Sequence, residues 1–284
     1  MNLSVRVLNF GDIRGDWTAQ LAGRPPGRRV QTPTNAFLIL GGEFPVLVDA
    51  GSRSTEALTR LGLGLETIWG EEHGLEAQLA QHGVRKEDIG MIIQTHLHVD
   101  HAGFLDRFLM SVPVIVNRRE LEFAYSGVGR LDYAPEDLHH VVERLYTPGA
   151  LGCLDLAFGE RAEILPGISA VCLGGHTPGS MAVVVETDAG AVCLCGDVVY
   201  DIHGALVERR GQLNALEPQT SGNFATSRLE EKRAIKLAVS LGRFLYPSHD
   251  HYGGVIEHGH VIGRIGRMIP GPVLPLAPQY ATAP

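Results

Sequence analysis

The sequence has few cysteines and no long apolar run, and both absences narrow its class. Its 4 cysteines among 284 residues are too few for the dense disulfide framework of a small secreted domain. No stretch approaches the roughly 18 uninterrupted apolar residues of a membrane-spanning helix. The start of the chain lacks the charged stretch and apolar run of a signal peptide. We therefore expect a cytoplasmic protein with no membrane partner.

The chain also lacks a block of Lys and Arg residues, and its formal net charge is −8 at pH 7. A protein that binds the nucleic-acid backbone needs clustered cations, so we expect no nucleic-acid partner. The hydrophobic fraction of 44% is enough for a large core, and 35 Gly with 16 Pro indicate many turns. We expect a single domain over residues 1–284.

One short segment, THLHVDHAG, follows a strand-like run at 89–95. His96, His98, Asp100 and His101 place four potential metal ligands within six residues. Side chains alternate along an extended chain, so His96 and His98 point the same way and can bind one cation. Asp100 and His101 come after the strand ends and can turn toward a second cation. This density of ligand-type residues predicts a metal site rather than ordinary surface histidines.

The segment resembles the His-x-His-x-Asp-His signature of the metallo-β-lactamase superfamily. Four other segments match the family's motifs in the family's order: Val46–Gly51, Gly175–Ser180, Cys195–Asp197 and Pro247–Asp250. The resemblance runs from about residue 35 to about residue 255. It implies an α/β fold, the αβ/βα sandwich of two mixed sheets with outer helices.

The resemblance also implies a site for two divalent metal ions. The first ion would be bound by His96, His98 and His176, the second by Asp100, His101 and His249, and Asp197 would bridge them. Zn²⁺ suits these ligands, with Fe, Mn or Co as alternatives. Two such ions about 3.5–4 Å apart bring the pKa of a shared water near 7. The family mechanism is then attack by metal-bound hydroxide on an ester carbonyl. Asp49 is expected to be buried and to orient a histidine or the adjacent turn.

Tyr200 follows Asp197 by three residues, a spacing that resembles the metallo-lactonases that open acyl-homoserine lactones. In that resemblance Tyr200 is catalytic and hydrogen-bonds the substrate carbonyl and the growing oxyanion. Asp100 is also catalytic, because it would pass the proton of the attacking water to the leaving alkoxide. The implied function is a dinuclear metal-dependent hydrolase that opens a lactone ring, with N-acyl-homoserine lactones as one substrate class.

Other functions remain open at this point. A thioesterase similar to glyoxalase II and an aryl-ester or organophosphate hydrolase share this fold. A non-catalytic binding protein is a further alternative, although all seven ligand positions are filled. The partner is expected to be a small lactone or ester, and a homodimer is left open.

The remaining histidines and cysteines are assigned more ordinary places. We expect His251 to line the pocket or face solvent, and His139, His140, His258 and His260 to be solvated. The cysteines are interpreted as small buried thiols, with Cys195 beside the metals as the alternative.

Alternation and β-branched residues predict strands at 3–9, 35–49, 113–117, 168–173, 181–187 and 190–195. Helices are predicted at 75–82, 118–125 and 135–145, and from a capping box that begins at Ser227 to about Leu241. Segment 11–34 is predicted to be a long loop, either an active-site rim, a subunit contact or a flexible linker. Segments 11–34, 118–156 and 201–225 are expected to form the substrate pocket, and 270–284 a surface tail.

Overall fold

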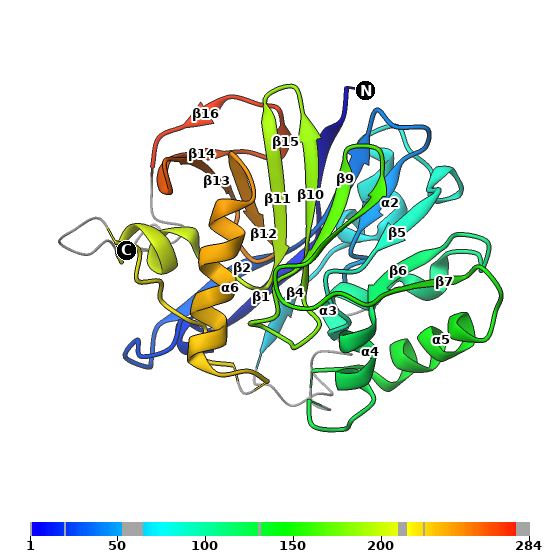
Figure 1. The fold of residues 1–284 in the computed structure, drawn as a ribbon, viewed down its shortest axis with the longest axis horizontal. Coiled ribbons are helices and arrows are strands. Elements are labelled where there is room, and N and C mark those ends of the chain that lie inside the picture. Colours follow the sequence, from blue (N-terminus) through cyan, green and yellow to red (C-terminus); the bar gives the residue numbers. More distant parts are fainter. Residues whose placement is uncertain are drawn as a thin grey trace.

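Two mixed β-sheets pack face to face in the computed structural model, and helices cover their outer sides (Figure 1). The structure describes residues 2–19, 21–52, 65–129, 132–209, 215–223 and 225–276. Within these residues each sheet has eight strands. This arrangement confirms the predicted sandwich of two mixed sheets.

The first sheet combines a parallel and an antiparallel part. Its order is β15-β1-β2-β3-β5-β6-β7, and β4 pairs with β1. The strands β3, β5, β6 and β7 run parallel. The bounds are β1 (Ser4–Asp16), β2 (Arg29–Leu40), β3 (Val46–Val48), β4 (Glu66–Ile68), β5 (Met91–Ile93), β6 (Val114–Asn117), β7 (Leu151–Leu154) and β15 (Met268–Ile269).

The second sheet is antiparallel except where β11 and β12 run parallel. Its order is β16-β14-β13-β12-β11-β10-β9-β8. The bounds are β8 (Arg161–Leu165), β9 (Ile168–Cys172), β10 (Met181–Thr187), β11 (Gly190–Gly196), β12 (Phe244–Pro247), β13 (Gly253–Glu257), β14 (His260–Ile265) and β16 (Val273–Leu274).

The helices confirm the four predicted helical segments, with small shifts at their ends. Ser227 caps the longest helix and forms the predicted capping box with Glu230. The helices are α2 (Leu75–Ala80), α3 (Val99–Ala102), α4 (Arg118–Ala124), α5 (Pro135–Leu145) and α6 (Arg228–Ser240), and single turns are η1 (Trp17–Ala19), η2 (Glu71–His73), η3 (Lys86–Asp88), η4 (Leu105–Arg107) and the π-helical η5 (His203–Val207). Among the described residues, none of the helices combines the length and hydropathy needed to cross a bilayer.

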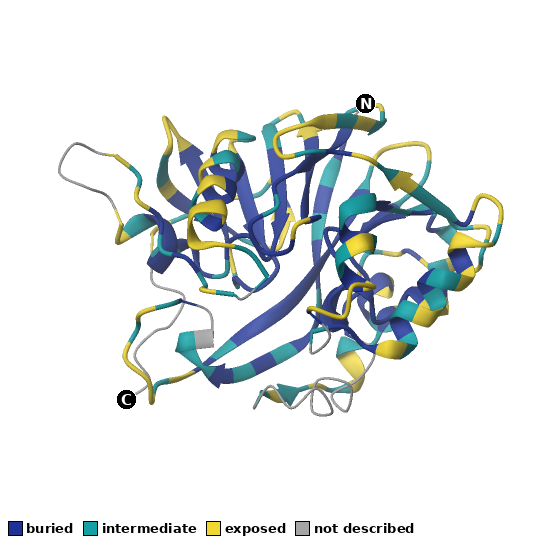
Figure 2. Ribbon diagram, turned by 60° about the horizontal axis from the view of Figure 1, so that its bottom comes forward, coloured by how far each residue is buried: buried dark blue, intermediate teal, exposed yellow. Residues whose placement is uncertain are grey.

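The core is layered, because successive side chains of a strand point to opposite faces of its sheet. On β10, Met181 and Val183 point between the sheets, whereas Ala182 and Val184 join the cluster that packs against α6. A third cluster fills the space between the first sheet and its helices. Figure 2 shows the buried strands at the centre and the exposed helix faces outside.

The prediction of a long loop at 11–34 is wrong. The strand β1 continues to Asp16 and pairs through Arg14↔Gln31 with β2, which begins at Arg29. Only 17–28 connects them. The register shifts between Asn9 and Asp12, and such a bulge obscures the alternation that would have revealed a strand.

Two other boundaries also differ from the prediction. The predicted strand 35–49 is two strands, β2 and β3, with a turn between them. The predicted tail contributes β16, which pairs with β14 through Arg264↔Leu274, so 270–276 is not a plain tail. Residues 277–284 of that tail lie outside the described part of the chain.

One end of the sandwich gathers the segments that carry ligand-type residues. Parallel neighbours end at the same edge of a sheet, so Asp49 after β3 lies beside the segment after β5, and Asp197 after β11 lies beside His249 after β12. The two sheets are joined here by backbone bonds, with the Met181 amide donating to the Thr95 carbonyl at 2.8 Å. A Cβ on Gly196 would lie 2.8 Å from Thr95 Oγ1, so this close approach requires glycine.

Arg144 on α5 is a buried guanidinium, 0% exposed, that anchors the outer layer of the first sheet. It donates to the carbonyl oxygens of Val112 at 2.8 Å, Phe108 at 3.0 Å and Leu105 at 3.2 Å. Arg144→Met would remove these bonds from the Val112 and Phe108 carbonyls, while the Leu105 carbonyl keeps the Phe108 amide as a donor at 3.3 Å. We expect the free energy of unfolding in urea to fall by at least about 3 kcal/mol, whereas Met at the exposed Arg228 changes it little. A loss under about 1 kcal/mol would contradict this role.

Candidate metal centre

The seven residues predicted to bind metal come together at the end of the sandwich. They form three overlapping groups whose ligand atoms lie within 4.8 Å of one another, and none of the seven is more than 8% exposed. They come from both sheets. The groups are His96 with His98 and His176, His96 with His101 and Asp197, and Asp100 with His101 and His249.

Three imidazoles form the first cluster. His176 lies in the turn between β9 and β10, and its Nε2 is 3.0 Å from His98 Nδ1. The ring centroid of His96 lies 4.5 Å from that of His98 and 4.7 Å from that of His176. Such a triangle of imidazole nitrogens is a suitable donor set for a transition-metal ion.

The second cluster contains more negative charge. His249 Nε2 lies 3.4 Å from one oxygen of Asp100, and His101 Nε2 lies 3.7 Å from the other. Asp100 and His101 both lie in the short helix α3. Carboxylate with imidazole again suits a divalent ion.

Asp197 lies between the two clusters. Its Oδ1 is 3.1 Å from His101 Nε2, and its Oδ2 is 3.1 Å from His249 Nε2. Toward the first cluster, the same Oδ2 is 3.6 Å from His176 Nε2 and 3.9 Å from His96 Nε2. One carboxylate therefore faces both clusters.

The electrostatics of the two clusters differ. Burial, reinforced by neighbouring imidazoles, holds the pKa of His96 and His98 well below the usual range, and burial lowers that of His176 to about 4. These rings are neutral at pH 7, as metal ligands must be.

In the second cluster the carboxylates favour the protonated, cationic form of the imidazoles. Burial opposes ionisation of His101 and His249, but the Asp197 and Asp100 carboxylates outweigh it and raise the pKa of His249 to about 10 and that of His101 well above normal. The carboxylates thus draw cationic charge into a dry site, and a divalent ion is a natural source of such charge.

A second, independent observation also indicates that these residues fit a bound metal. His96 Nε2, His101 Nε2 and Asp197 Oδ1 are buried and make no hydrogen bond, because the 3.1 Å approach of Asp197 Oδ1 to His101 Nε2 lacks hydrogen-bond geometry. Buried polar atoms are normally paired, so three such atoms within one group indicate a missing coordination partner. The types of ligand and the buried atoms without a hydrogen bond therefore both indicate a metal-binding site.

The remaining ring nitrogens are held from behind. Asp49, which is 0% exposed, lies with one carboxylate oxygen 2.9 Å from His101 Nδ1 and accepts from the Thr95 amide at 2.7 Å. This confirms that Asp49 orients a histidine and the turn beside it. His249 Nδ1 lies 2.8 Å from the Pro33 carbonyl. Such outer partners fix the orientation of a ligating imidazole.

The sequence does not reveal Pro33, because the bulge obscures the pairing of β1 with β2, the strand that contains Pro33. A strand signal across this bulge would place Pro33 near the site.

Tyr200 lies beside Asp197 and His249. Its hydroxyl donates to Asp197 Oδ2 at 2.9 Å, and its ring stacks on His249 with centroids 4.9 Å apart. Burial and then the nearby carboxylates raise the pKa of Tyr200 well above normal. The phenol therefore keeps its proton and remains a hydrogen-bond donor.

The other histidines do not join the described clusters. His251 is half-buried, with Nε2 3.3 Å from the Gln31 carbonyl. Of the four histidines predicted to be solvated, His139 and His258 are exposed, whereas His140 and His260 are half-buried, and His140 Nε2 accepts from Arg144 Nε at 2.9 Å.

The cysteines largely fit the interpretation as buried thiols, since Cys172, Cys193 and Cys195 are buried, but Cys153 is exposed. The Cys195 thiol lies 3.8 Å from the Tyr246 carbonyl, within the cluster that faces α6.

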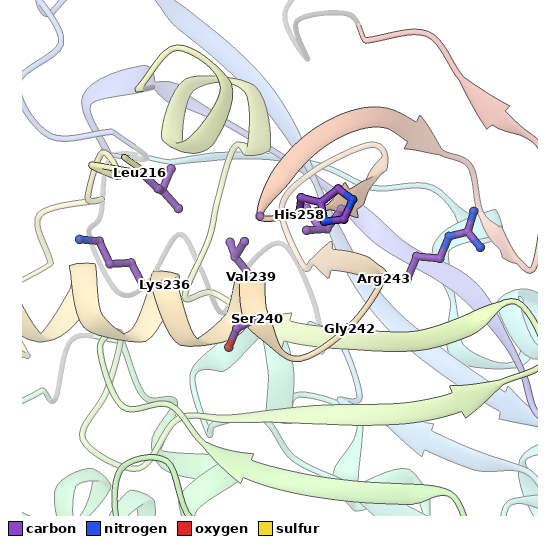
Figure 3. Close-up of a pocket in the computed structure, with 9 residues that line it drawn as sticks. Leu216, Lys236, Val239, Ser240, Gly242, Arg243 and His258 are labelled. Atoms are coloured by element: carbon purple, nitrogen blue, oxygen red, sulfur yellow. The ribbon is translucent and has the colours of Figure 1, made fainter. Parts of the chain in front are cut away.

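Two pockets lie apart from the seven residues. An open pocket of about 520 Å³ is lined by Lys236 and Val239 of α6 and by Arg243 and His258 (Figure 3). Another of about 300 Å³ is lined by Gly174 and Pro178 of the turn that contains His176. The expectation that 11–34, 118–156 and 201–225 form the substrate pocket stays a prediction.

The fold and the buried clusters together define a two-sheet protein with a metal centre at the end of its sheets. Comparison with known proteins identifies the family. Residues 29–256 match the metallo-beta-lactamase superfamily, and the chain belongs to that superfamily. The resemblance inferred from the motifs is thereby confirmed.

Individual relatives are lactonases. The chain is 30% identical over 247 residues to the N-acyl homoserine lactonase AttM of Azorhizobium caulinodans, covering 79% of this chain and 84% of that protein. It also resembles a solved N-acyl homoserine lactone hydrolase with the product N-hexanoyl-L-homoserine at its catalytic metal centre (TM-score 0.62, 23% identity, 84% and 87% of the two chains). A third similar protein is AidC, a dizinc quorum-quenching lactonase in complex with a product (TM-score 0.59, 16% identity, 97% and 95%).

Removal of divalent ions should lower the stability of the protein. A metal that binds only the folded state adds about 4 kcal/mol when its concentration is a thousandfold above Kd. We expect chelator-treated protein to unfold at a lower temperature than Zn²⁺-loaded protein in differential scanning calorimetry, with the difference restored by added metal. Identical melting temperatures would contradict a metal centre.

Proposed function

We propose that this protein is a dinuclear metal-dependent lactonase whose substrates are N-acyl-homoserine lactones. The observation that carries the proposal is the Asp197 carboxylate between two clusters of imidazoles, with the Tyr200 hydroxyl directed at it. The lactonase relatives supply the substrate class. Opening of such lactones would make the protein a quorum-quenching enzyme, as AidC is described.

Two metal ions are proposed, most simply Zn²⁺ on this donor set. His96, His98 and His176 would hold one; Asp100, His101 and His249 would hold the other; and Asp197 would contact both. When bound, the ions would supply Lewis acidity and lower the pKa of a water molecule to near 7.

Asp100 is proposed to move the proton. Its two oxygens face different imidazoles, His101 and His249, and at 8% it is the most exposed of the seven residues. A carboxylate that borders the other ligands can accept the proton of the attacking water. It can then deliver this proton to the alkoxide that leaves when the lactone ring opens.

Tyr200 is proposed to stabilise the developing charge. Its hydroxyl remains protonated, and its ring is fixed by stacking on His249. Rotation of the hydroxyl toward a bound lactone would give a hydrogen bond to the carbonyl oxygen, which strengthens as negative charge grows there.

A substrate panel tests the proposed activity. Metal-loaded protein should open N-hexanoyl- and N-decanoyl-homoserine lactone, and a pH-stat should record one proton released per ring. Activity should disappear on chelation and return with metal. The same protein should hydrolyse S-lactoylglutathione, p-nitrophenyl acetate and paraoxon with a kcat/KM at least tenfold lower, on the order of the discrimination that one pocket contact provides.

The panel separates the alternatives. Preference for the thioester would replace the proposal with a thioesterase, and preference for the aryl ester or phosphotriester would replace it with the corresponding hydrolase. A flat trace with every lactone from protein that contains metal would contradict the proposal.

Tyr200→Phe isolates the hydroxyl, because phenylalanine keeps the ring stacked on His249. We expect kcat for lactone opening to fall by about 10²-fold, the typical effect of removing one oxyanion donor, with a smaller change in KM. Tyr146→Phe is the matched control, since Tyr146 is 82% exposed and outside the clusters. Wild-type kcat in the Tyr200 variant would show that the hydroxyl has no catalytic role.

A further inference from the structure

Glu120 on α4 is a buried carboxylate that holds the first cluster without touching its imidazoles. It is 0% exposed. Its Oε1 accepts from the Leu97 amide and from the Tyr133 hydroxyl, both at 2.9 Å. Its Oε2 accepts from the hydroxyl of Thr177. Each of the three donors adjoins the three-histidine cluster.

The Leu97 amide needs this partner because it lies outside the sheet. The strand β5 ends at Ile93, so the ladder of the sheet does not hold the residues that follow. Asp49 accepts from the Thr95 amide, and Glu120 accepts from the Leu97 amide. Leu97 lies between two cluster histidines, so a fixed peptide at Leu97 fixes the directions of both imidazoles.

The other two bonds reach the rest of the cluster. Thr177 directly follows His176 in the turn between β9 and β10. Tyr133 places its ring edge-on to His98, with centroids 4.7 Å apart. Bonds from one carboxylate therefore restrain the backbone or the ring contacts of all three histidines.

The packing of α4 against the turn is close. A Cβ on Gly179 would lie 2.0 Å from the Glu120 backbone nitrogen, so only glycine permits this approach. The start of α4 and the His176 turn thus form one packed unit, with the Glu120 side chain at its centre.

Among the described residues Glu120 is met by three hydrogen bonds and not by an ion pair. Burial raises its pKa, while the bonds from Thr177, Leu97 and Tyr133 act in the opposite direction. A buried carboxylate that lacks an ion pair is costly unless hydrogen bonds compensate it. Its advantage over an apolar side chain is that two oxygens can accept three donors from three separate segments.

We propose that Glu120 is a positioning residue that sets the geometry of the metal subsite formed by His96, His98 and His176. The proposal rests on the proposed function, because it assumes that these histidines bind a metal. Asp49 performs the corresponding task for His101 of the second cluster, and through Thr95 it also borders His96.

Cobalt titration of metal-free protein tests the proposal. Co²⁺ binding is followed by visible absorption, and the bound metal is counted by mass spectrometry. In Glu120→Ala we expect one of the two ions to bind at least about tenfold more weakly, the lower end of the effect of outer-shell substitutions, while the other binds as in the wild type. The ratio of the two affinities is a readout that a general loss of stability would not change.

Two milder variants keep the test decisive if Glu120→Ala does not fold. Glu120→Gln retains an acceptor for Leu97 and Tyr133, and its amide can donate to Thr177, whose hydroxyl also pairs with Ser180 at 2.8 Å. It should recover most of the lost affinity. Tyr133→Phe removes one bond, keeps the ring beside His98, and should weaken the same ion by less than Glu120→Ala does.

Arg144→Met is the control for a general loss of stability. Arg144 is a buried side chain on α5, and its partners are the carbonyl oxygens of Leu105, Phe108 and Val112, outside the metal clusters. We expect it to lose stability in urea yet bind both ions as the wild type does.

The outcomes are distinct. Wild-type affinities for both ions in every Glu120 and Tyr133 variant would overturn the proposal, as would equal weakening of both ions or the same effect in Arg144→Met. If the wild-type protein itself binds no cobalt, the proposed function fails, and this inference fails with it.

Discussion

The structure depends on the concentration of negative charge within a dry group of imidazoles. Asp49, Asp100 and Asp197 are buried with five histidines at the end of two sheets. Carboxylates in such a place require nearby positive charge. Without metal, His101 and His249 supply it, as the direction of their pKa shifts indicates. A pair of divalent ions would satisfy the same demand and leave the histidines as neutral ligands.

The fold brings these carboxylates and imidazoles together because the ligands come from segments of both sheets. The first sheet contributes the segment after β5, and the second contributes His176, Asp197 and His249 from three separate loops. Backbone bonds join the sheets at this end, from Met181 to Thr95 and from Asn35 to Ser248. The site is therefore part of the interface that holds the sandwich together. Behind it, Asp49 and Glu120 fix the backbone at two points on either side of His96.

Much of this arrangement was predictable from sequence, for identifiable reasons. Ligands such as His96 and His98 are close in the chain, and the distant ones lie in short motifs whose composition is unusual. Helices with local signals, such as the one capped by Ser227, were also predictable. The continuation of β1 and β2 was not, because a bulge breaks the alternation. Glu120 was part of a predicted helix, but its three bonds join segments that only the tertiary fold brings together.

The account is tested most directly by anomalous scattering from crystals of the protein grown with Zn²⁺, measured on both sides of the zinc absorption edge. It predicts two zinc peaks about 3.5–4 Å apart, one beside His96, His98 and His176, the other beside Asp100, His101 and His249, with the Asp197 carboxylate between them. A single peak, no peak, or an Asp197 side chain turned away from both positions would contradict it.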